Sequence, residues 1–372
     1  MNDRAPLKNF VVKNIHDREL TEERPYTKYD ITIQSGCALT KERIAELADD
    51  AGDNISEKNP SFSELTALYW VWKNIREEYI GWSHYRRRLD LSEQEIEYYI
   101  QQGVDAILAE PVIFQSEGVV QNIKELYISY HTVDAWETMM EVIKKRDPEC
   151  YAHIETLSRG TEMFPACMGI YKYEHFERYC AWVFPILEEV YSIIGEKWDR
   201  YQNRYIAFLA ERLHSFYFMH YEPDLQIVTV PIREYTSRSK SISDRKETLT
   251  SEALIEQTMK LIHNRQAHMA HSYMHNQYEK YPELFTEEVK QLLDILEVVQ
   301  YETQFTEQTL LRYTTDYHKL VEYYQKLLEI AGWMLEDENN EQHMEYAAEF
   351  MREHQTSMKA LEFIIYLLSK DN

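Results

Sequence analysis

The sequence predicts an α/β domain followed by a C-terminal domain made only of helices. Up to about residue 240, short β-type runs alternate with helical segments, and from about residue 247 the strand patterns cease. Alternation of strands and helices is typical of an α/β fold. A length of 372 residues also favours a large domain with an appendage over one core. We therefore expect domains at residues 1–240 and 247–372.

Six apolar or β-branched runs are the expected strands of the first domain. Turn-forming residues bound most of them, which is the usual pattern of strands in a sequence. The runs are NFVV (9–12), YDITIQSG (29–36), YIGWSHY (79–85), VDAILAEP (104–111), PACMGIYK (165–172) and LQIVTVPI (225–232).

Helical patterns separate these runs and fill the second domain. The segment 63–75 places its apolar residues on one face, and Ser63 is expected to cap its N-terminus. The segment 201–220 is expected to be a long, mostly buried helix. After residue 247 the amphipathic segments often have acidic first turns, which suit helix N-termini. The polar, basic segment 238–246 between the domains is expected to be a linker or a mobile loop.

Composition excludes several classes of function. A formal charge of -24 opposes general binding to nucleic acid, because such a field repels phosphate backbones. The four cysteines form no C-x-x-C pair, so they indicate reduced thiols rather than a zinc or redox motif. No run approaches the length of a membrane-spanning helix, and the N-terminus lacks the apolar region of a signal peptide. We expect a cytoplasmic protein, with association at the inner face of the membrane left open.

A small basic island stands out against this acidic background, in the stretch YIGWSHYRRRLDL at residues 79–91. His84, Arg86 and Arg87 follow an apolar run, and ligands of open α/β sheets bind beyond the carboxyl ends of strands. Alternation along a strand would put His84 and Arg86 towards one side and Arg87 towards the other. Arginine suits bidentate phosphate contacts, so the island is a candidate anion site. Arginines paired with surface carboxylates at a solvated strand end are the alternative, and composition alone favours it.

Several stretches resemble a bacterial family of capsular-polysaccharide glycosyltransferases catalogued as a domain of unknown function. They are IQSGCAL, LADDAGDNISEKNPSFSELTALYWVWKN, YIGWSHYRR, FPACMGIYKYEHFERYCAWVFPIL and YQNRYIAFLAERL, within residues 29–232. The resemblance implies a GT-A-like nucleotide-sugar-binding fold. It also implies transfer of a sugar from a nucleotide donor, most simply UDP-linked, to a surface-polysaccharide or other glycan acceptor.

The resemblance assigns roles to particular residues. For the donor diphosphate they are His84, Arg86 and Arg87. For the nucleotide they are Lys13, Asp53, Asn54 and Ser56, although turn chemistry explains the Gly-Asp-Asn run equally well. Outside the matched stretches, Arg238 and Lys240 are expected to add positive charge above the diphosphate if segment 238–246 closes over the donor, because lids that exclude water are common in transferases. A plain interdomain linker is the alternative. The chain departs from the family at Lys13, Asn14 and His16, where a Thr-His-Lys type turn is usual. It departs again at Arg88 and Leu89, where an aromatic pair is usual.

No Asp-x-Asp pair follows a strand, although such a pair commonly holds a divalent ion in GT-A enzymes. We therefore expect donor binding without a divalent metal, and no other cofactor. His268, His271 and His275 lie on one helical face, which invites a metal interpretation. Three ligands from one straight helix do not easily surround a zinc ion, so no metal site is assigned there.

Glu211 is the candidate catalytic base, because it interrupts a largely apolar helix in a matched stretch. A structural ion pair with Arg204 or Arg212 is the alternative. Tyr127, His131 and Asp134 are candidates for the acceptor side, against the simpler interpretation of an ordinary helix surface.

Two rival functions remain open at this point. One is a non-catalytic interaction protein on a degenerate glycosyltransferase scaffold, with the C-terminal helices as the contact for a partner or a second copy. The other is a sugar-nucleotide hydrolase, which would use the same donor pocket with water as acceptor.

Overall fold

The computed structural model describes residues 6–113, 115–116, 119–120, 122–221, 224–238, 249–336 and 341–370. The chain divides into two compact units. The first contains residues 1–130, 135–196 and 204–241, and the second contains residues 131–134, 197–203 and 242–372. Two short segments from the middle of the sequence therefore belong to the second unit.

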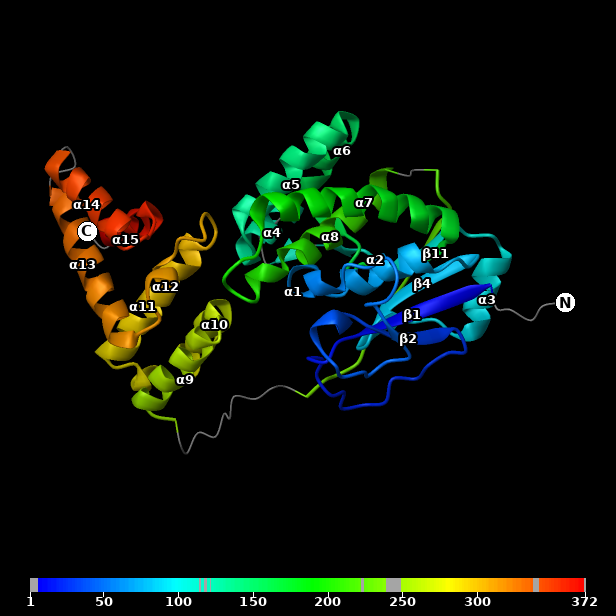
Figure 1. Cartoon of the computed structure of the whole chain (residues 1–372), viewed down its shortest axis with the longest axis horizontal. Coiled ribbons are helices and arrows are strands. Elements are labelled where there is room, and N and C mark those ends of the chain that lie inside the picture. The colour runs from blue at the N-terminus through cyan, green and yellow to red at the C-terminus, as the bar shows by residue number, and fades with distance from the viewer. Residues whose placement is uncertain are drawn as a thin grey trace. The chain divides into compact units, whose positions relative to one another are not determined.

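A nine-stranded sheet forms the centre of the first unit (Figure 1). Its main run has the order β12-β6-β11-β4-β1-β2-β3, and β5 pairs with β4 and β13 beside it. Neighbours in the main run are parallel, except that β11 is antiparallel to both β4 and β6. The strands are β1 (Leu7–Lys13), β2 (Asp30–Gln34), β3 (Leu47–Ala48), β4 (Tyr79–His84), β5 (Arg87–Leu89), β6 (Ala106–Ala109), β11 (Gly169–Lys172), β12 (Ile227–Val230) and β13 (Ile232–Glu234). Two small ladders pair β7 (Val112–Ile113) with β10 (Glu162–Met163), and β8 (Gln115–Ser116) with β9 (Val119–Val120).

The sheet is covered on both faces, which explains its apolar central strands. In β4, Ile80 and Trp82 belong to one core and Tyr79 to another, as alternation along a strand requires. Helices α2, α7 and α8 supply the first core, and α3 supplies the second. All six strands expected from the sequence are present, each within or close to its expected run.

The helices of the first unit include the two expected from the sequence, and both are shorter than expected. They are α1 (Asn59–Phe62), α2 (Leu65–Asn74), α3 (Glu93–Gln101), α4 (Ile123–Tyr130), α5 (Val133–Arg146), α6 (Pro148–Ser158), α7 (Tyr173–Ile194) and α8 (Tyr205–Phe216). The expectation that Ser63 caps α2 is wrong. Glu64 occupies the cap position, and Ser63 has a left-handed backbone with φ 49° and accepts a hydrogen bond from Arg204 instead.

The basic island forms a hairpin rather than a continuous strand. The chain turns at residues 85–86, so that Arg87 pairs with His84. Residues directly opposite each other in an antiparallel pair share a face of the sheet. His84 and Arg87 therefore lie on one side, which corrects the alternation expected from the sequence.

The second unit contains only helices in its described part. Its core joins side chains such as Leu292, Leu327 and Leu361, all 0 % exposed. The helices are α9 (Ser251–His263), α10 (Ala267–Lys280), α11 (Glu287–Glu302), α12 (Leu310–Tyr313), α13 (Tyr317–Glu336), α14 (Glu341–Glu353) and α15 (Met358–Lys370).

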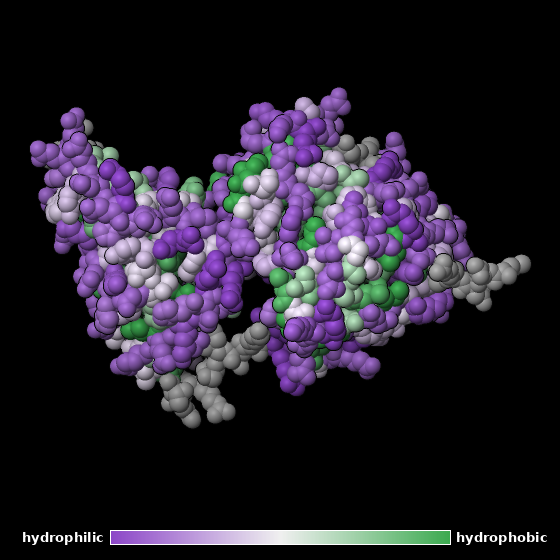
Figure 2. Space-filling view, viewed as in Figure 1, coloured by the Kyte–Doolittle hydropathy of each residue, from purple (hydrophilic) through white to green (hydrophobic). Residues whose placement is uncertain are grey.

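Hydrophilic residues cover most of the visible face of each unit, with smaller apolar patches between them (Figure 2). This distribution is expected of a chain with 28 % charged residues. Within the described ranges, the helices include none with the length and apolar character needed to cross a membrane.

Candidate functional site

The carboxyl ends of three parallel strands meet at one edge of the sheet. Lys13, the last residue of β1, is in register with Gln34 of β2, and Val12 is in register with His84 of β4. Asn14 follows β1, and its side-chain amide donates to the backbone oxygen of Ser35, 3.2 Å away, just after β2. This edge is where an open α/β sheet binds ligands.

Arg86 and Arg87 stand at this edge and share a carboxylate partner. Glu234 Oε1 lies 3.1 Å from a terminal nitrogen of Arg87 and 3.8 Å from Nε of Arg86. The pairing with a surface carboxylate that the sequence left open is therefore present. Each guanidinium group carries five N–H donors, so both arginines retain donors for an anion beside Glu234. Their side chains are each 34 % exposed, which leaves them accessible to a ligand.

One short turn connects the basic hairpin to helix α8. Nε2 of His84 donates to the backbone oxygen of Ala166, 2.7 Å away, and the backbone N–H of Ala166 donates to Oε1 of Glu211, also 2.7 Å away. Ala166 and Cys167 both have left-handed backbones, with φ of 66° and 49°. Such conformations cost free energy in residues other than glycine and persist only where the surroundings hold them. His84 and Glu211 hold this turn from two sides, which brings two candidate site residues to one structure.

Glu211 also forms the ion pair that the sequence analysis considered. Its Oε2 lies 2.7 Å from a terminal nitrogen of Arg212, whereas Arg204 bonds to Ser63. The Glu211 side chain is 29 % exposed and that of Arg212 only 7 %. The carboxylate is thus held by a buried arginine and is still partly exposed to solvent.

Sequence reasoning missed Asp17, which follows β1 in the stretch NIHD. Burial raises the pKa of its carboxyl group to about 7, and the nearby charge of Glu64 adds to the effect. The backbone N–H of Asn14, together with Lys13 and Arg86, acts in the opposite direction. An acidic residue three positions after a strand-end asparagine was the signal that could have identified it.

The residues expected to bind the nucleotide have local structural partners. Ser56 is fully buried, and its hydroxyl group donates to Asp49 at 2.6 Å. Asn54 donates to the backbone oxygen of Gly52 and accepts from the backbone of Ser56, as in an Asx turn. Asp53 accepts from the hydroxyl group of Tyr69. Lys13 lies over the ring of Tyr26, 5.8 Å from its centroid, at the strand edge itself.

The candidates for the acceptor side divide between the two units. Tyr127 is 0 % exposed and packs in the core of the first unit, against Trp136. His131 and Asp134 belong to the second unit, where Asp134 forms an ion pair with Lys197 at 2.8 Å. The acceptor role of these three residues therefore stays a prediction.

Most of the loop expected to close over the donor, residues 238–246, lies outside the described residues. Arg238 forms an exposed ion pair with Glu19 at 2.8 Å. Lys240 lies outside the described residues.

Comparison with known proteins places the first unit in a family. A family model described as a domain of unknown function, DUF4422, matches residues 15–222, more than half of the 372 residues. The chain belongs to this family. The match ends before α9, so helices α9 to α15 lie beyond it.

A solved structure supplies the fold comparison. The chain is similar to the apo structure of the bifunctional glycosyltransferase WbbM, with 24 % identity and a TM-score of 0.54. The similarity covers 64 % of this chain and 48 % of that one, so the chain spans about half the length of its structural relative. A comparison with curated proteins gave no match. The fold of the first unit is accordingly GT-A-like, as expected from the sequence, and an all-helical region follows it.

Proposed function

We propose that this protein is a glycosyltransferase that moves a sugar from a UDP-linked donor to a surface-polysaccharide or other glycan acceptor. The observation that carries the proposal is the position of Arg86 and Arg87 at the carboxyl edge of β1, β2 and β4. An acidic chain needs local positive groups to hold an anionic donor, and this hairpin supplies them. The similarity of the fold to a glycosyltransferase supports the same interpretation.

Donor binding would use the charge of the hairpin instead of a metal ion. Arg86 and Arg87 would contact the diphosphate, and Glu234 would give up or share its contact with Arg87. The proton on Nε2 of His84 is directed to the oxygen of Ala166, so His84 would position the hairpin against the turn rather than bind phosphate. Lys13 would add positive charge beside the nucleotide.

The transfer step would need a carboxylate that accepts the proton of the acceptor hydroxyl group as its oxygen bonds to the anomeric carbon. The bond from that carbon to the diphosphate breaks in the same step, and UDP leaves at the arginines. Glu211 is our candidate for this base if the reaction inverts the anomeric centre. Its two oxygens accept from Ala166 and Arg212, and each carboxylate oxygen has a further lone pair for the acceptor. Asp17 is a second candidate, because it is close enough to Arg86 for that charge to lower its pKa.

The first test is calorimetric titration of the full chain with UDP. Charge-assisted hydrogen bonds contribute about 1.5–3 kcal/mol each, so Arg87→Ala should weaken binding at least about tenfold. Arg159→Ala is the matched control, because Arg159 is an exposed arginine of the same unit that forms an ion pair with Glu155. EDTA should leave the affinity of the unaltered protein unchanged.

Three outcomes would decide against parts of this proposal. Unchanged UDP affinity in both Arg86→Ala and Arg87→Ala would remove the hairpin as the diphosphate site. Loss of binding in EDTA, restored by manganese, would show that a metal is required. Cleavage of UDP-sugars at the same rate with and without glycan acceptors would favour the hydrolase.

A further inference from the structure

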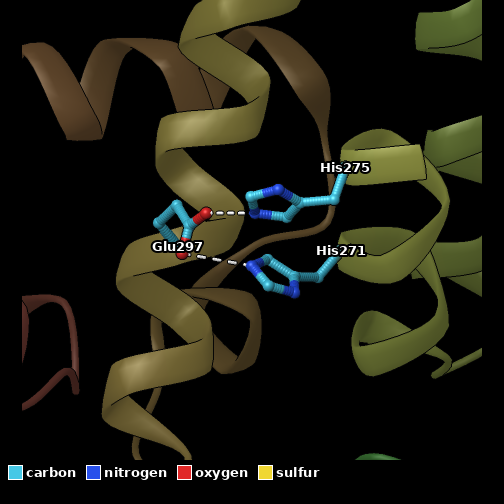
Figure 3. A group of neighbouring side chains, drawn as sticks. All are labelled: His271, His275 and Glu297. Atoms are coloured by element: carbon cyan, nitrogen blue, oxygen red, sulfur yellow. Dashed lines mark hydrogen bonds and ion pairs between the residues drawn. The ribbon is translucent and has the colours of Figure 1, made fainter. Parts of the chain in front are cut away.

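Two neighbouring helices of the second unit bring three potential metal ligands together. His271 and His275 lie one turn apart on α10, and Glu297 faces them from α11 (Figure 3). Nε2 of His271 lies 3.1 Å from one carboxylate oxygen of Glu297, and Nε2 of His275 contacts the other. The ligand atoms of all three residues lie within 4.8 Å of one another.

This grouping differs from the one considered in the sequence. His268 is turned away, with its ring stacked on that of Tyr201 at a centroid distance of 4.2 Å. Glu297 takes the third place and comes from a different helix. The objection that one straight helix cannot surround an ion therefore does not apply to this set.

We propose that His271, His275 and Glu297 bind one divalent transition-metal ion, with zinc as the ion that fits best. Zinc takes imidazole nitrogens and carboxylate oxygens at about 2.0–2.2 Å, and two histidines with one glutamate are an established ligand set for it. A tetrahedral site with such bonds has ligand atoms about 3.3–3.5 Å apart. Small side-chain rotations would bring the present atoms to that spacing.

The surroundings of the three residues suit a bound cation. The His275 side chain is 46 % exposed and that of Glu297 34 %, so a fourth position is open to water or another ligand. The His271 side chain is only 18 % exposed, which anchors the site against the helix pair. Asp294, one turn before Glu297, is close enough for the two carboxylates to interact, and its charge would favour a cation.

The sequence of α10 indicates what the ion would do. The helix carries histidines at positions i and i+4, the spacing of a zinc hydrolase motif, but Ser272 stands where that motif has its general base, a glutamate. The site has zinc ligands without that base. We infer that the ion links α10 to α11 and stabilises the helical unit rather than hydrolysing a substrate.

The experiment uses the full chain after treatment with a chelator and its removal. Calorimetric titration with zinc should show one site, which His271→Ala and Glu297→Gln should each weaken at least about tenfold, since loss of even an outer partner of a metal site costs about 10–100-fold. His263→Ala, an exposed histidine on α9 of the same unit, should keep the affinity unchanged. Cobalt should bind in place of zinc and give visible absorption typical of a four-coordinate ion.

Zinc should also raise the melting temperature of the unaltered protein, because a ligand that binds only the folded state stabilises it. Circular dichroism checks that each variant is folded. If His271→Ala fails to fold, Glu297→Gln still provides the test, because it preserves the shape of the side chain. Absence of a zinc site in the unaltered protein would overturn the proposal. Equal zinc affinity in the unaltered protein and the folded variants would overturn it as well, because zinc would then bind elsewhere.

Discussion

Glu211 is the residue on which two interpretations of the first unit meet. Its carboxylate supports the turn at Ala166 and pairs with Arg212, which are structural contacts. It also remains partly exposed near the basic hairpin, as a base for an acceptor would. A substitution that keeps the shape and removes the negative charge separates the two roles.

We expect Glu211→Gln to leave UDP affinity and folding largely intact and to lower the transfer rate by roughly 10²–10⁴-fold. The amide oxygen of the glutamine can still accept from Ala166, so the turn should persist. An amide cannot take up a proton at neutral pH, so the base is lost. The checks are steady-state transfer kinetics, UDP calorimetry and thermal melting on the same sample. Near-normal turnover would exclude the base, and a large drop in melting temperature would assign Glu211 to the ion pair with Arg212. In the first case Asp17→Asn becomes the next variant to measure.

The sequence placed the basic residues at a strand end but predicted neither the hairpin nor the contacts that complete the site. Apolar runs with alternating faces locate β4, so His84, Arg86 and Arg87 could be placed at a strand end. The contact between His84 and Ala166 depends on the direction of β11 and on the left-handed turn before it. Neither follows from local residue preferences, because alanine and cysteine rarely adopt such a conformation.

Helix α8 acts as the support for the turn before β11. Ser215 bonds to both backbone groups of Phe164, and Glu211, four residues earlier on the same helix face, accepts from Ala166. The sequence predicted this helix from its apolar pattern and predicted burial correctly. The contacts of its polar residues with the turn before β11 depend on the tertiary structure and could not be predicted from the sequence. The N-cap error at Ser63 has a similar origin, since Arg204 and a left-handed backbone override the local preference.

The last residue of α11, Glu302, has a buried carboxyl group with a testable effect on stability. Glu302 is 0 % exposed and accepts from the backbone N–H of Leu310 at 2.9 Å and from the hydroxyl group of Ser357 at 3.2 Å. Burial raises its pKa from the ordinary 4.5 to about 8. The folded state thus holds a proton that the unfolded state releases near pH 4.5.

The free energy of unfolding should therefore fall as the pH rises from about 4.5 to 8 and level off above. Each pKa unit corresponds to about 1.4 kcal/mol, so a decline of about 1–4 kcal/mol is expected after relaxation. Glu302→Gln carries no titrating group and should abolish this decline, with Glu279→Gln on the exposed face of α10 as control. Urea unfolding at pH 5 and pH 8.5 measures the decline in the unaltered protein and in each variant. An undiminished decline in Glu302→Gln would show that another group causes it.

The whole molecule has separate apolar cores in its two units. Phe184 belongs to the core of the first unit and Leu327 to that of the second. Units with their own cores can unfold in separate steps. Two transitions in calorimetry of the full chain are the expected result.

Each core substitution should lower the midpoint temperature of one transition, and a ligand should raise the midpoint temperature of one. Phe184→Ala and Leu327→Ala each remove a buried side chain, at a cost of about 2–5 kcal/mol. UDP should raise the transition that Phe184→Ala lowers and leave the other in place. A single transition that both substitutions lower equally would contradict separate unfolding.

The reversed direction of β11 has a consequence for how this family can diversify. The flanking strands β4 and β6 run the other way and send loops to the ligand edge after they end, whereas β11 places there the segment that precedes it, at Ala166 and Cys167. Inserted residues in that segment would pull His84 and Glu211 apart. After β11, where Lys172 pairs with Asp105 at the opposite edge, extra residues would disturb no candidate site residue. Length variation among relatives should therefore accumulate at the opposite edge, while the short turn keeps its length.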